Sequence, residues 1–347
     1  MLNYRARFVS ATLSGLLLLA MAGCRPDGAA GTAEPSVTRQ YPVMGTMVEV
    51  KLYGEAVAAA RAADAVQAEF LAVEQACNIF DPESEISRLN ERAGNEPVAC
   101  SELLWDVLVS ARRFYAFSDG AFDITARPLM DLWGFYRKRQ TLPDEAEIVA
   151  AQQRVGLDKV AFDDAARSIR FLAPDVRIDL GGIAKGYAVD RAVAAALAQG
   201  ITAGTINLGG NVACLPDPPP GRDAYRIGIR HPRDRDELCG TVVISGSLAM
   251  ATSGNYEKSV VIEGRRFTHI MDPSTGRPVA DMMAVTVITP RAVDSDGLST
   301  AIFIRGEALA RRACAEIPGT RVLIIRDIPD SEPEILRFGP GWEDCRL

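Results

Sequence analysis

Histidine is nearly absent from this sequence: among its 347 residues only His231 and His269 are histidines. Catalytic zinc sites commonly take two or three histidine ligands, so this scarcity nearly excludes a zinc enzyme of that kind. The chain also lacks any block dense in lysine and arginine, and its formal net charge is −7. Both features argue against nucleic acid as a partner.

The seven cysteines form no Cys-x-x-Cys pair, which argues against a zinc knuckle or a redox-active pair. Six of them follow Cys24, at positions 77, 100, 214, 239, 314 and 345. An even number permits disulfides in an exported protein, and buried free thiols explain most of them equally well.

The first residues resemble an export signal rather than part of the fold. Arg5 and Arg7 precede the apolar run Phe8–Met21, which is too short for a typical membrane-spanning helix. Small residues directly before Cys24 resemble a bacterial lipoprotein processing site, although Met21 stands where leucine is usual. We therefore expect a signal peptide over residues 1–23 and a lipid anchor on Cys24. An ordinary cleaved signal is the alternative.

Residues 24–38 are small, polar and interrupted by proline, which is typical of a flexible tether. Several acyl chains on one residue attach a protein firmly to a membrane. The sequence thus predicts a bacterial inner-membrane lipoprotein that faces the periplasm. Arg25, the residue after the lipidated cysteine, does not by itself decide between inner and outer membrane.

The remaining residues, 39–347, show helical patterns early and strands late, with some alternation. We expect a short helix from Ser84 or Glu85 and longer ones over Glu55–Phe80, Glu102–Phe117, Pro143–Val155, Ile183–Ala198, Asp294–Ile304 and Glu307–Ala315. We expect strands over Gln40–Tyr53, Lys159–Phe162, Ser168–Leu172, Thr205–Leu208, Tyr225–Ile229, Thr241–Ser245, Ser259–Ile262, Arg266–Ile270, Ala284–Thr289, Arg321–Ile325 and Glu334–Phe338. This order favours an α+β fold with mixed or antiparallel sheets and flanking helices. Two lobes around a central cleft are compatible with it, but no linker marks a boundary.

The segment Arg177–Asp190 begins as an expected strand, passes Gly181 and Gly182, and continues as an alanine-rich helix. Free amides at the start of that helix would favour an anion such as phosphate. Asp179 could hold a ribose, a heterocycle N–H or a metal-linked water. The simpler interpretation is a strand-to-helix turn that needs two glycines.

Asp296 and Thr300 lie four residues apart in an expected helix and therefore share a face. A carboxylate and a hydroxyl one turn apart suit Mg²⁺, which prefers oxygen ligands. We expect Asp296 to face solvent. The alternative is that this segment only caps its helix, through Asp294 or Ser295.

His269 ends an expected strand just before an Asp-Pro-x-x-Gly turn, which is a suitable place for a catalytic residue at a cleft. A surface histidine without a role is the alternative, and His231, in a charged loop, is assigned none. Met44, Phe80 and Phe122 could line a slot for a flat ring or belong to the core.

Taken in order, eight segments of this chain resemble the ApbE family of flavin transferases. They are residues 44–46 (Met-Gly-Thr), 81–90 (Asp-Pro-Glu-Ser-Glu-Ile-Ser-Arg-Leu-Asn), 120–123 (Gly-Ala-Phe-Asp), 179–190 (Asp-Leu-Gly-Gly-Ile-Ala-Lys-Gly-Tyr-Ala-Val-Asp), 207–211 (Asn-Leu-Gly-Gly-Asn), 252–257 (Thr-Ser-Gly-Asn-Tyr-Glu), 269–276 (His-Ile-Met-Asp-Pro-Ser-Thr-Gly) and 296–300 (Asp-Gly-Leu-Ser-Thr). The resemblance spans Arg39 to about Ala313. One such segment is a weak signal, whereas eight in sequence order are highly specific.

The resemblance implies an exported, Mg²⁺-dependent enzyme that splits FAD, transfers FMN to a Thr or Ser hydroxyl of a partner protein and releases AMP. Family partners are subunits of membrane redox complexes of the sodium-pumping (Nqr) or Rnf type, and related flavoproteins. An FAD pyrophosphatase that uses water in place of the hydroxyl is one alternative. A non-catalytic periplasmic FAD-binding protein is another, although binding alone needs neither a catalytic histidine nor a metal pair.

The resemblance also assigns roles by position. FAD contacts fall on Met44, Phe80, Ala121, Phe122, Asp123, Asp179, Lys185 and Ile270. Magnesium ligands fall on Asp296, Thr300 and the Gly182 carbonyl, with Ser299 as an additional candidate. His269 matches the catalytic histidine, so we expect a transfer rate that rises through the pKa of an ordinary imidazole. Phe80 departs from the family, since many members carry tyrosine there; ring stacking survives this change and a phenol hydrogen bond does not.

Overall fold

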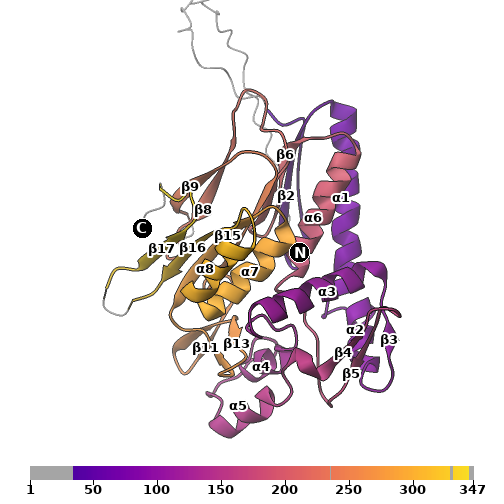
Figure 1. Cartoon of the computed structure of the whole chain (residues 1–347), viewed down its shortest axis with the longest axis vertical. Helices are drawn as coiled ribbons and strands as arrows, with labels where there is room; N and C mark the ends of the chain where they lie inside the picture. Colours follow the sequence, from indigo (N-terminus) through magenta and orange to yellow (C-terminus); the bar gives the residue numbers. More distant parts are fainter. Residues whose placement is uncertain (1–33, 235, 329–330, 344–347) are drawn as a thin grey trace, which may run out of the picture. The chain divides into compact units, whose positions relative to one another are not determined.

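An eight-stranded antiparallel sheet forms the centre of the described chain, as Figure 1 shows. In spatial order its strands are β1 (Val37–Val43), β2 (Thr46–Tyr53), β6 (Ala203–Leu208), β7 (Asn211–Cys214), β10 (Leu248–Gly254), β15 (Met282–Thr289), β16 (Arg321–Arg326) and β17 (Glu334–Phe338). All eight residues of β15 are buried. A strand that is buried on both faces lies in the middle of a sheet covered on both sides.

The computed structural model describes residues 34–234, 236–328 and 331–343. The expected signal peptide, Cys24, most of the tether and Cys345 lie outside these residues. Within the described ranges, no helix is both long enough and apolar enough to cross a membrane. The described residues all belong to one compact unit, so the fold does not divide into two lobes.

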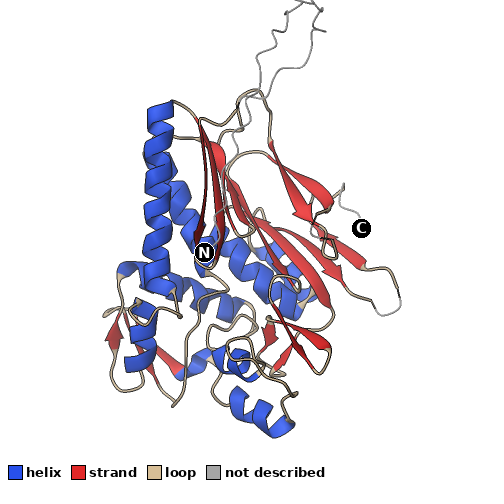
Figure 2. Ribbon diagram, turned by 180° about the vertical axis from the view of Figure 1, so that it is seen from behind, coloured by secondary structure: helices blue, strands red, loops and turns tan. Residues whose placement is uncertain are grey.

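Helices cover one face of the sheet, as Figure 2 shows. They are α1 (Ala56–Cys77), α6 (Ala184–Ala198), α7 (Ala292–Arg305) and α8 (Glu307–Glu316), with α2 (Glu85–Arg92) and α3 (Glu102–Phe117) beside them. Alternate residues of β16 point to opposite sides: Val322 and Ile324 enter the core under the helices, and Leu323 and Ile325 enter a second core. The second core lies under the two-stranded ribbon β8 (Tyr225–Arg230) and β9 (Leu238–Ile244). The predicted α+β fold with flanking helices is confirmed.

Two smaller groups of elements complete the described fold. Strands β3 (Val98–Ala99), β5 (Ser168–Phe171) and β4 (Val160–Asp163) form a small sheet that includes the predicted hairpin, next to the 3-10 helix Leu157–Lys159. A third core, around Trp133 and Ile148, joins α4 (Arg127–Leu132), α5 (Glu145–Gln152), β11 (Ser259–Ile262), β12 (Arg265–Thr268) and β13 (Met271–Asp272). The strand β14 (Arg277–Pro278) pairs with β13. The indole N–H of Trp133 donates to the Gly276 carbonyl at 2.9 Å, which ties α4 to the turn that follows His269.

One end of the large sheet collects the segments predicted to carry function. Met44 and Gly45 form a two-residue hairpin turn between β1 and β2, with φ angles of 51° and 70°, as a type I′ turn requires. The next turn, between β6 and β7, lies against it, since a Cβ on Gly209 would meet Thr46 Oγ1 at 2.5 Å. The strand β10 ends and β15 begins at this same end, so the intervening segment that carries His269 also starts from it.

The segment before Gly181 is not a strand, contrary to the prediction from sequence. Residues 176–180 pair with no neighbouring strand. The backbone of Ile178 instead exchanges two hydrogen bonds, of 2.8 and 2.7 Å, with the buried side-chain amide of Asn90. The Asp179 amide donates to the Ile124 carbonyl at 2.8 Å. A side chain and a loop thus replace the ladder of a sheet and fix the backbone of Asp179.

Four of the cysteines are free thiols: Cys77, Cys100, Cys214 and Cys314. Burial raises the pKa of Cys77 and of Cys214 to about 12, so these thiols are unreactive near neutral pH. For these four positions the free-thiol alternative holds.

Helices α6 and α7 cap each other at their N-termini. The Asp190 carboxylate, on α6, accepts from the amides of Ala292 and Val293 at 2.6 and 3.1 Å. In return, Asp296 Oδ2, on α7, accepts from the Gly186 amide at 2.9 Å. The predicted alternative, in which Asp294 or Ser295 caps α7, is wrong: Asp294 pairs with Arg113 and the Ser295 hydroxyl donates to the Ala292 carbonyl.

Gly186 allows this close crossing, because a Cβ there would lie 2.3 Å from the Ala292 carbonyl oxygen and 2.6 Å from Asp296 Cβ. Gly186→Ala should therefore destabilise the protein by roughly 1–3 kcal/mol, the cost of overpacking a tight contact. Gly94→Ala is the matched control, since nothing lies within 4 Å of its Cβ position. Urea unfolding should show the loss for Gly186→Ala only, and equal midpoints for both variants would contradict the crossing described here.

Candidate functional site

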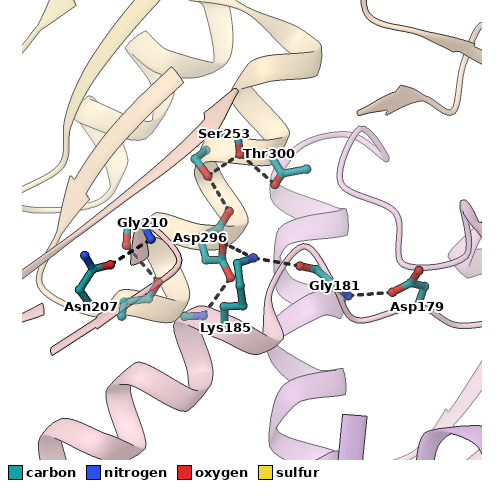
Figure 3. Close-up of polar contacts among 12 residues, drawn as sticks. Asp179, Gly181, Lys185, Asn207, Gly210, Ser253, Asp296 and Thr300 are labelled. Atoms are coloured by element: carbon teal, nitrogen blue, oxygen red, sulfur yellow. Dashed lines mark hydrogen bonds and ion pairs between the residues drawn. The ribbon is translucent and has the colours of Figure 1, made fainter. Parts of the chain in front are cut away.

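Three hydroxyl side chains from β10 and α7 meet beside α7, and Figure 3 shows Ser253 and Thr300 among them. Ser253 Oγ, near the end of β10, lies 2.9 Å from Ser299 Oγ and 3.3 Å from Thr300 Oγ1. The Ser299 hydroxyl also donates to the Asp296 carbonyl at 2.9 Å. The predicted pairing of Asp296 and Thr300 on one helix thus gains a third oxygen, from Ser253, that the sequence analysis did not assign. Its only sequence signal is its place in the Thr-Ser-Gly-Asn-Tyr-Glu segment.

Asp296 is buried, with 5 % of its surface exposed, and the expectation that it faces solvent is wrong. Burial raises the pKa of its carboxyl, while the charge of Lys185 and the amide of Gly186 act in the opposite direction. Lys185 Nζ lies 3.6 Å from Asp296 Oδ1 and donates to the Gly181 carbonyl at 3.2 Å. Lys185 therefore links the glycine turn to the buried carboxylate.

Three amides at the start of α6 already have partners. The Gly181 amide donates to Asp179 Oδ1 at 2.9 Å, the Ala184 amide to the Leu180 carbonyl, and the Gly186 amide to Asp296. The anion site expected at this turn stays a prediction, and the Lys185 ammonium, whose side chain is 27 % exposed, supplies a positive group for it.

The oxygen atoms gathered here fit a magnesium ion. Among the described residues, no three His, Cys, Asp or Glu side chains come together to hold a metal, so a cation would depend on hydroxyl and carbonyl oxygens around one carboxylate. That is the usual pattern for Mg²⁺, which keeps waters and takes substrate phosphates as ligands. A Cβ on Gly182 would lie 3.7 Å from Thr300 Oγ1, which places Gly182 next to the Thr300 hydroxyl.

Asn211 supplies a further sign that this place holds a polar group. Its side chain hydrogen-bonds to Asp296, and its own Oδ1 is buried without a hydrogen-bond partner among the described residues. A buried carbonyl oxygen left unpaired costs free energy, so it is retained where a ligand, an ion or a water satisfies it. The sequence analysis gave Asn211 no role beyond its place in the Asn-Leu-Gly-Gly-Asn segment.

An aromatic pair stands beside Asp179. Phe80 is 70 % exposed, and the ring of Tyr136 packs edge-on against it, with 5.5 Å between the ring centroids. The Tyr136 hydroxyl donates to Asp179 Oδ2, and burial raises the pKa of Tyr136, so the phenol keeps its proton. Tyr136 was not predicted from the sequence, because it lies outside the eight segments that carry the family resemblance.

The predicted contacts Ala121, Phe122 and Asp123 form a loop next to the glycine turn. Phe122 is buried, and a Cβ on Gly182 would lie 3.2 Å from its ring. Asp123 Oδ1 accepts from the Thr125 amide and hydroxyl at 2.7 and 2.6 Å, and burial raises the pKa of this carboxyl. Asp123 therefore stabilises its own loop and keeps its second oxygen for other contacts.

Met44 and Ile270 lie far apart in the sequence, and each is anchored by a hydrogen bond of its backbone. The Met44 amide donates to Glu74 Oε1 on α1 at 2.7 Å, which fixes the β1–β2 turn at the functional end of the sheet. Ile270 is buried directly after His269, and its carbonyl accepts from the Val279 amide at 3.0 Å. Ile270 therefore anchors the segment that presents His269.

His269 is held by a single carbonyl group. Its amide and its Nδ1 both lie 3.2 Å from the Lys258 carbonyl oxygen, so Nδ1 carries the proton and Nε2 keeps its lone pair. Burial lowers the pKa of His269 to about 4, with the charges of Lys258 and Lys185 acting in the same direction. This pKa lies below the ordinary imidazole value that we expected from the sequence. The imidazole is neutral at pH 7 and can accept a proton through Nε2.

Comparison with known proteins agrees with this geometry. The model of the ApbE family matches residues 44–324. The protein named FAD:protein FMN transferase from Salmonella typhimurium is 32 % identical over 297 residues, which cover 83 % of this chain and 84 % of that protein. A Klebsiella pneumoniae protein of the same name is 31 % identical over 318 residues, covering 89 % of this chain and 90 % of its own length.

Solved structures give the same result. The ApbE protein from Thermotoga maritima superposes with a TM-score of 0.78 at 32 % identity, over 87 % of this chain and 96 % of its own. The flavin transferase ApbE from Vibrio cholerae gives a TM-score of 0.74 at 27 % identity, over the same shares.

The low pKa of His269 can be measured directly, because His231→Ala leaves one imidazole in the chain. The ring proton signal of His269 should titrate near pH 4 by NMR. Since the unfolded imidazole takes up its proton near pH 6.5, the folded state should lose stability as the pH falls from about 6.5 towards 4 and keep it above that range. A titration midpoint near 6.5 would show that the surroundings described here do not act on His269.

Proposed function

The chain belongs to the ApbE family, and we propose on this basis that it is an FAD:protein FMN transferase. The reaction moves FMN from FAD to a Thr or Ser hydroxyl of a protein acceptor and releases AMP. The observation that carries this proposal is the position of Lys185, which lies 3.6 Å from Asp296 on the helix that also carries Thr300, and whose charge lowers the pKa of a neutral His269. Positive charge for a pyrophosphate and a base for a hydroxyl are what the reaction requires.

In the proposed step, the acceptor hydroxyl oxygen attacks the phosphorus on the FMN side of the pyrophosphate. A new P–O bond forms to the acceptor, and the bond to the bridging oxygen breaks as AMP leaves. The proton of the hydroxyl goes to His269 Nε2, which is unprotonated because the histidine pKa is about 4. No residue of this chain needs to form a covalent bond, so direct in-line transfer accounts for the reaction.

Lys185 is the residue of this chain that would offset phosphate charge. Its ammonium already lies against Asp296 and the Gly181 carbonyl, which holds it beside the glycine turn before a substrate arrives. A pre-positioned cation acts on developing charge without first having to reorganise.

We further propose Mg²⁺ as the metal, held by the Asp296 carboxylate, the Thr300 hydroxyl and the Gly182 carbonyl. Ser299 is the weakest of the predicted ligands, since its hydroxyl is engaged with Ser253 and with the Asp296 carbonyl. When bound, the ion would neutralise part of the pyrophosphate charge. The unpaired Asn211 Oδ1 supports a bound ion or its water at this place.

FAD is proposed to contact the remaining predicted residues. The isoalloxazine ring would use the exposed face of Phe80, and Asp179 would accept from a heterocycle N–H. The set proposed for FAD is Met44, Phe80, Ala121, Phe122, Asp123, Asp179, Lys185 and Ile270. Their support is that the described structure places Phe80, Asp179, Lys185 and Phe122 around the glycine turn.

The cellular setting is also a proposal. The Met21-Ala22-Gly23-Cys24 run after an apolar segment supports a lipoprotein anchored in the bacterial inner membrane and facing the periplasm. The acceptor would then be a subunit of a membrane redox complex of the Nqr or Rnf type, or a related flavoprotein.

Cys24→Ser tests the anchor. Without an acylated cysteine the protein should leave the membrane fraction or keep its signal peptide, because the lipid chains supply the membrane affinity. Membrane fractionation together with the mass of the mature protein distinguishes these results. A wild-type distribution and a wild-type mature mass in the variant would reject lipidation.

Transfer itself is tested by incubating the protein with FAD, Mg²⁺ and a candidate acceptor domain. The acceptor should gain the mass of one FMN, one AMP should appear for each FMN transferred, and EDTA should stop the reaction until Mg²⁺ is restored. If FMN and AMP appear without modified acceptor, the pyrophosphatase alternative is favoured. If FAD binds and neither product forms, the carrier alternative is favoured.

Four variants separate the roles within this assay. His269→Ala should slow transfer by roughly 10²–10⁴-fold, the usual effect of removing a general base, whereas His231→Ala should keep the wild-type rate.

Asp296→Asn keeps an acceptor for the Gly186 amide but loses the charge that a metal needs, so it should lose activity with little change in stability. Asp296→Ala also removes the cap of α6, and we expect it to cost about 1 kcal/mol of stability.

A further inference from the structure

Tyr136 joins two residues that are far apart in the sequence. Its ring packs against Phe80, and its hydroxyl donates to Asp179. These are the two side chains proposed above to meet the flavin end of FAD, one by stacking and one by a hydrogen bond. Tyr136 contacts both and belongs to neither of their segments.

The contact with Phe80 fixes how that ring is presented. The two ring planes meet at 65°, so a flat ligand that stacks on Phe80 cannot also stack on Tyr136. A T-shaped contact covers at most one face of the Phe80 ring, and because this side chain is 70 % exposed, a ring face remains open to a ligand. An edge-to-face pair of this kind is worth about 0.5–1.5 kcal/mol, which restrains a side chain that is otherwise 70 % exposed.

The contact with Asp179 fixes the carboxylate. Asp179 Oδ1 accepts from the Gly181 amide and Oδ2 accepts from Tyr136, so both oxygens are oriented while each keeps a lone pair. The ring of Tyr136 is held in turn by the Arg127 guanidinium, which lies 5.4 Å from the ring centroid. Arg127 begins α4, which Trp133 ties to the turn after His269.

We propose that Tyr136 is a specificity-determining residue for the flavin ring of FAD. It holds Phe80 and Asp179 at the spacing that a planar heterocycle with an N–H donor requires: one side chain for the face of the ring and one for its edge. This inference rests on the proposed function, because it takes FAD as the ligand. It assigns Tyr136 a positioning role in which the phenol acts through Asp179 and the ring acts through Phe80.

The test compares two ligands on the whole protein by isothermal titration calorimetry. FAD carries the isoalloxazine ring, and ADP shares the adenosine diphosphate part without it. Tyr136→Phe should weaken FAD binding about tenfold, the effect of one hydrogen bond to a charged group, and leave ADP binding unchanged. Tyr136→Ala should weaken FAD binding further, since the support for Phe80 is lost as well.

Two controls make the result specific. Tyr41→Phe removes the same hydroxyl from β1, where the phenol oxygen is buried without a partner among the described residues, and it should leave FAD affinity at the wild-type value. In a double-mutant cycle, Phe80→Ala combined with Tyr136→Ala should lose little more affinity than the worse single variant, because both act on one ring contact.

Two results with Tyr136→Phe would overturn the inference. One is wild-type FAD affinity. The other is an equal loss of affinity for FAD and ADP, which would indicate a general structural role. Additive losses in the double-mutant cycle would overturn the link through Phe80. If the unaltered protein does not bind FAD, the proposed function fails instead, before any Tyr136 variant is measured.

Discussion

The reciprocal capping of α6 and α7 is the constraint on which the rest of the site depends. The Asp190 carboxylate accepts hydrogen bonds from the first amides of α7, and the Asp296 carboxylate accepts one from the first turn of α6. Gly186 lets the two helices approach closely enough for both contacts. The arrangement places a buried carboxylate at the start of two helices, where the helix dipoles favour negative charge. Because the helix dipoles favour its charge, the buried Asp296 carboxylate can lie close to Lys185 and to the hydroxyls of α7. No second acidic residue is needed beside it. The same side chain serves the fold and the proposed chemistry.

The sheet explains why residues from distant segments reach this point. Because neighbouring strands are antiparallel, the β1–β2 turn, the β6–β7 turn and the end of β10 all lie at one end of the sheet. Ser253 and Asn211 reach the site in this way, each from a strand end whose backbone is fixed by pairing. His269 comes from the segment between β10 and β15 and is attached separately, through Lys258 and through the core around Trp133. His269 and the oxygen cluster are thus supported by different parts of the fold.

Sequence patterns predicted the parts of this structure that local chemistry determines. The helix over Glu102–Phe117 has the predicted bounds, since Ser101 caps it and apolar residues repeat along one side. The pairing of Asp296 with Thr300 followed from helical spacing in the same way. Local patterns did not predict the bonds from Asn90 to Ile178 or from Tyr136 to Asp179, which join positions 88 and 43 residues apart. The burial of Asp296 was missed for a related reason, because its capping partner Gly186 lies on another helix. A charged residue is predicted to be exposed as long as the group that compensates its charge is unknown.

The Phe80 position shows how a change in one residue can be balanced elsewhere in the fold. Without a hydroxyl, Phe80 offers a ligand only its ring. The ring of Tyr136 packs against Phe80, whereas its phenol points to Asp179. In the proposed complex, the polar contact to the edge of the flavin would therefore come from a carboxylate that is held by two donors. A held carboxylate loses less conformational entropy on binding than a mobile one. With the stacking group and the hydrogen-bonding group on separate segments, affinity for a flat heterocycle would depend on the spacing between them, and Tyr136 is the residue that contacts both.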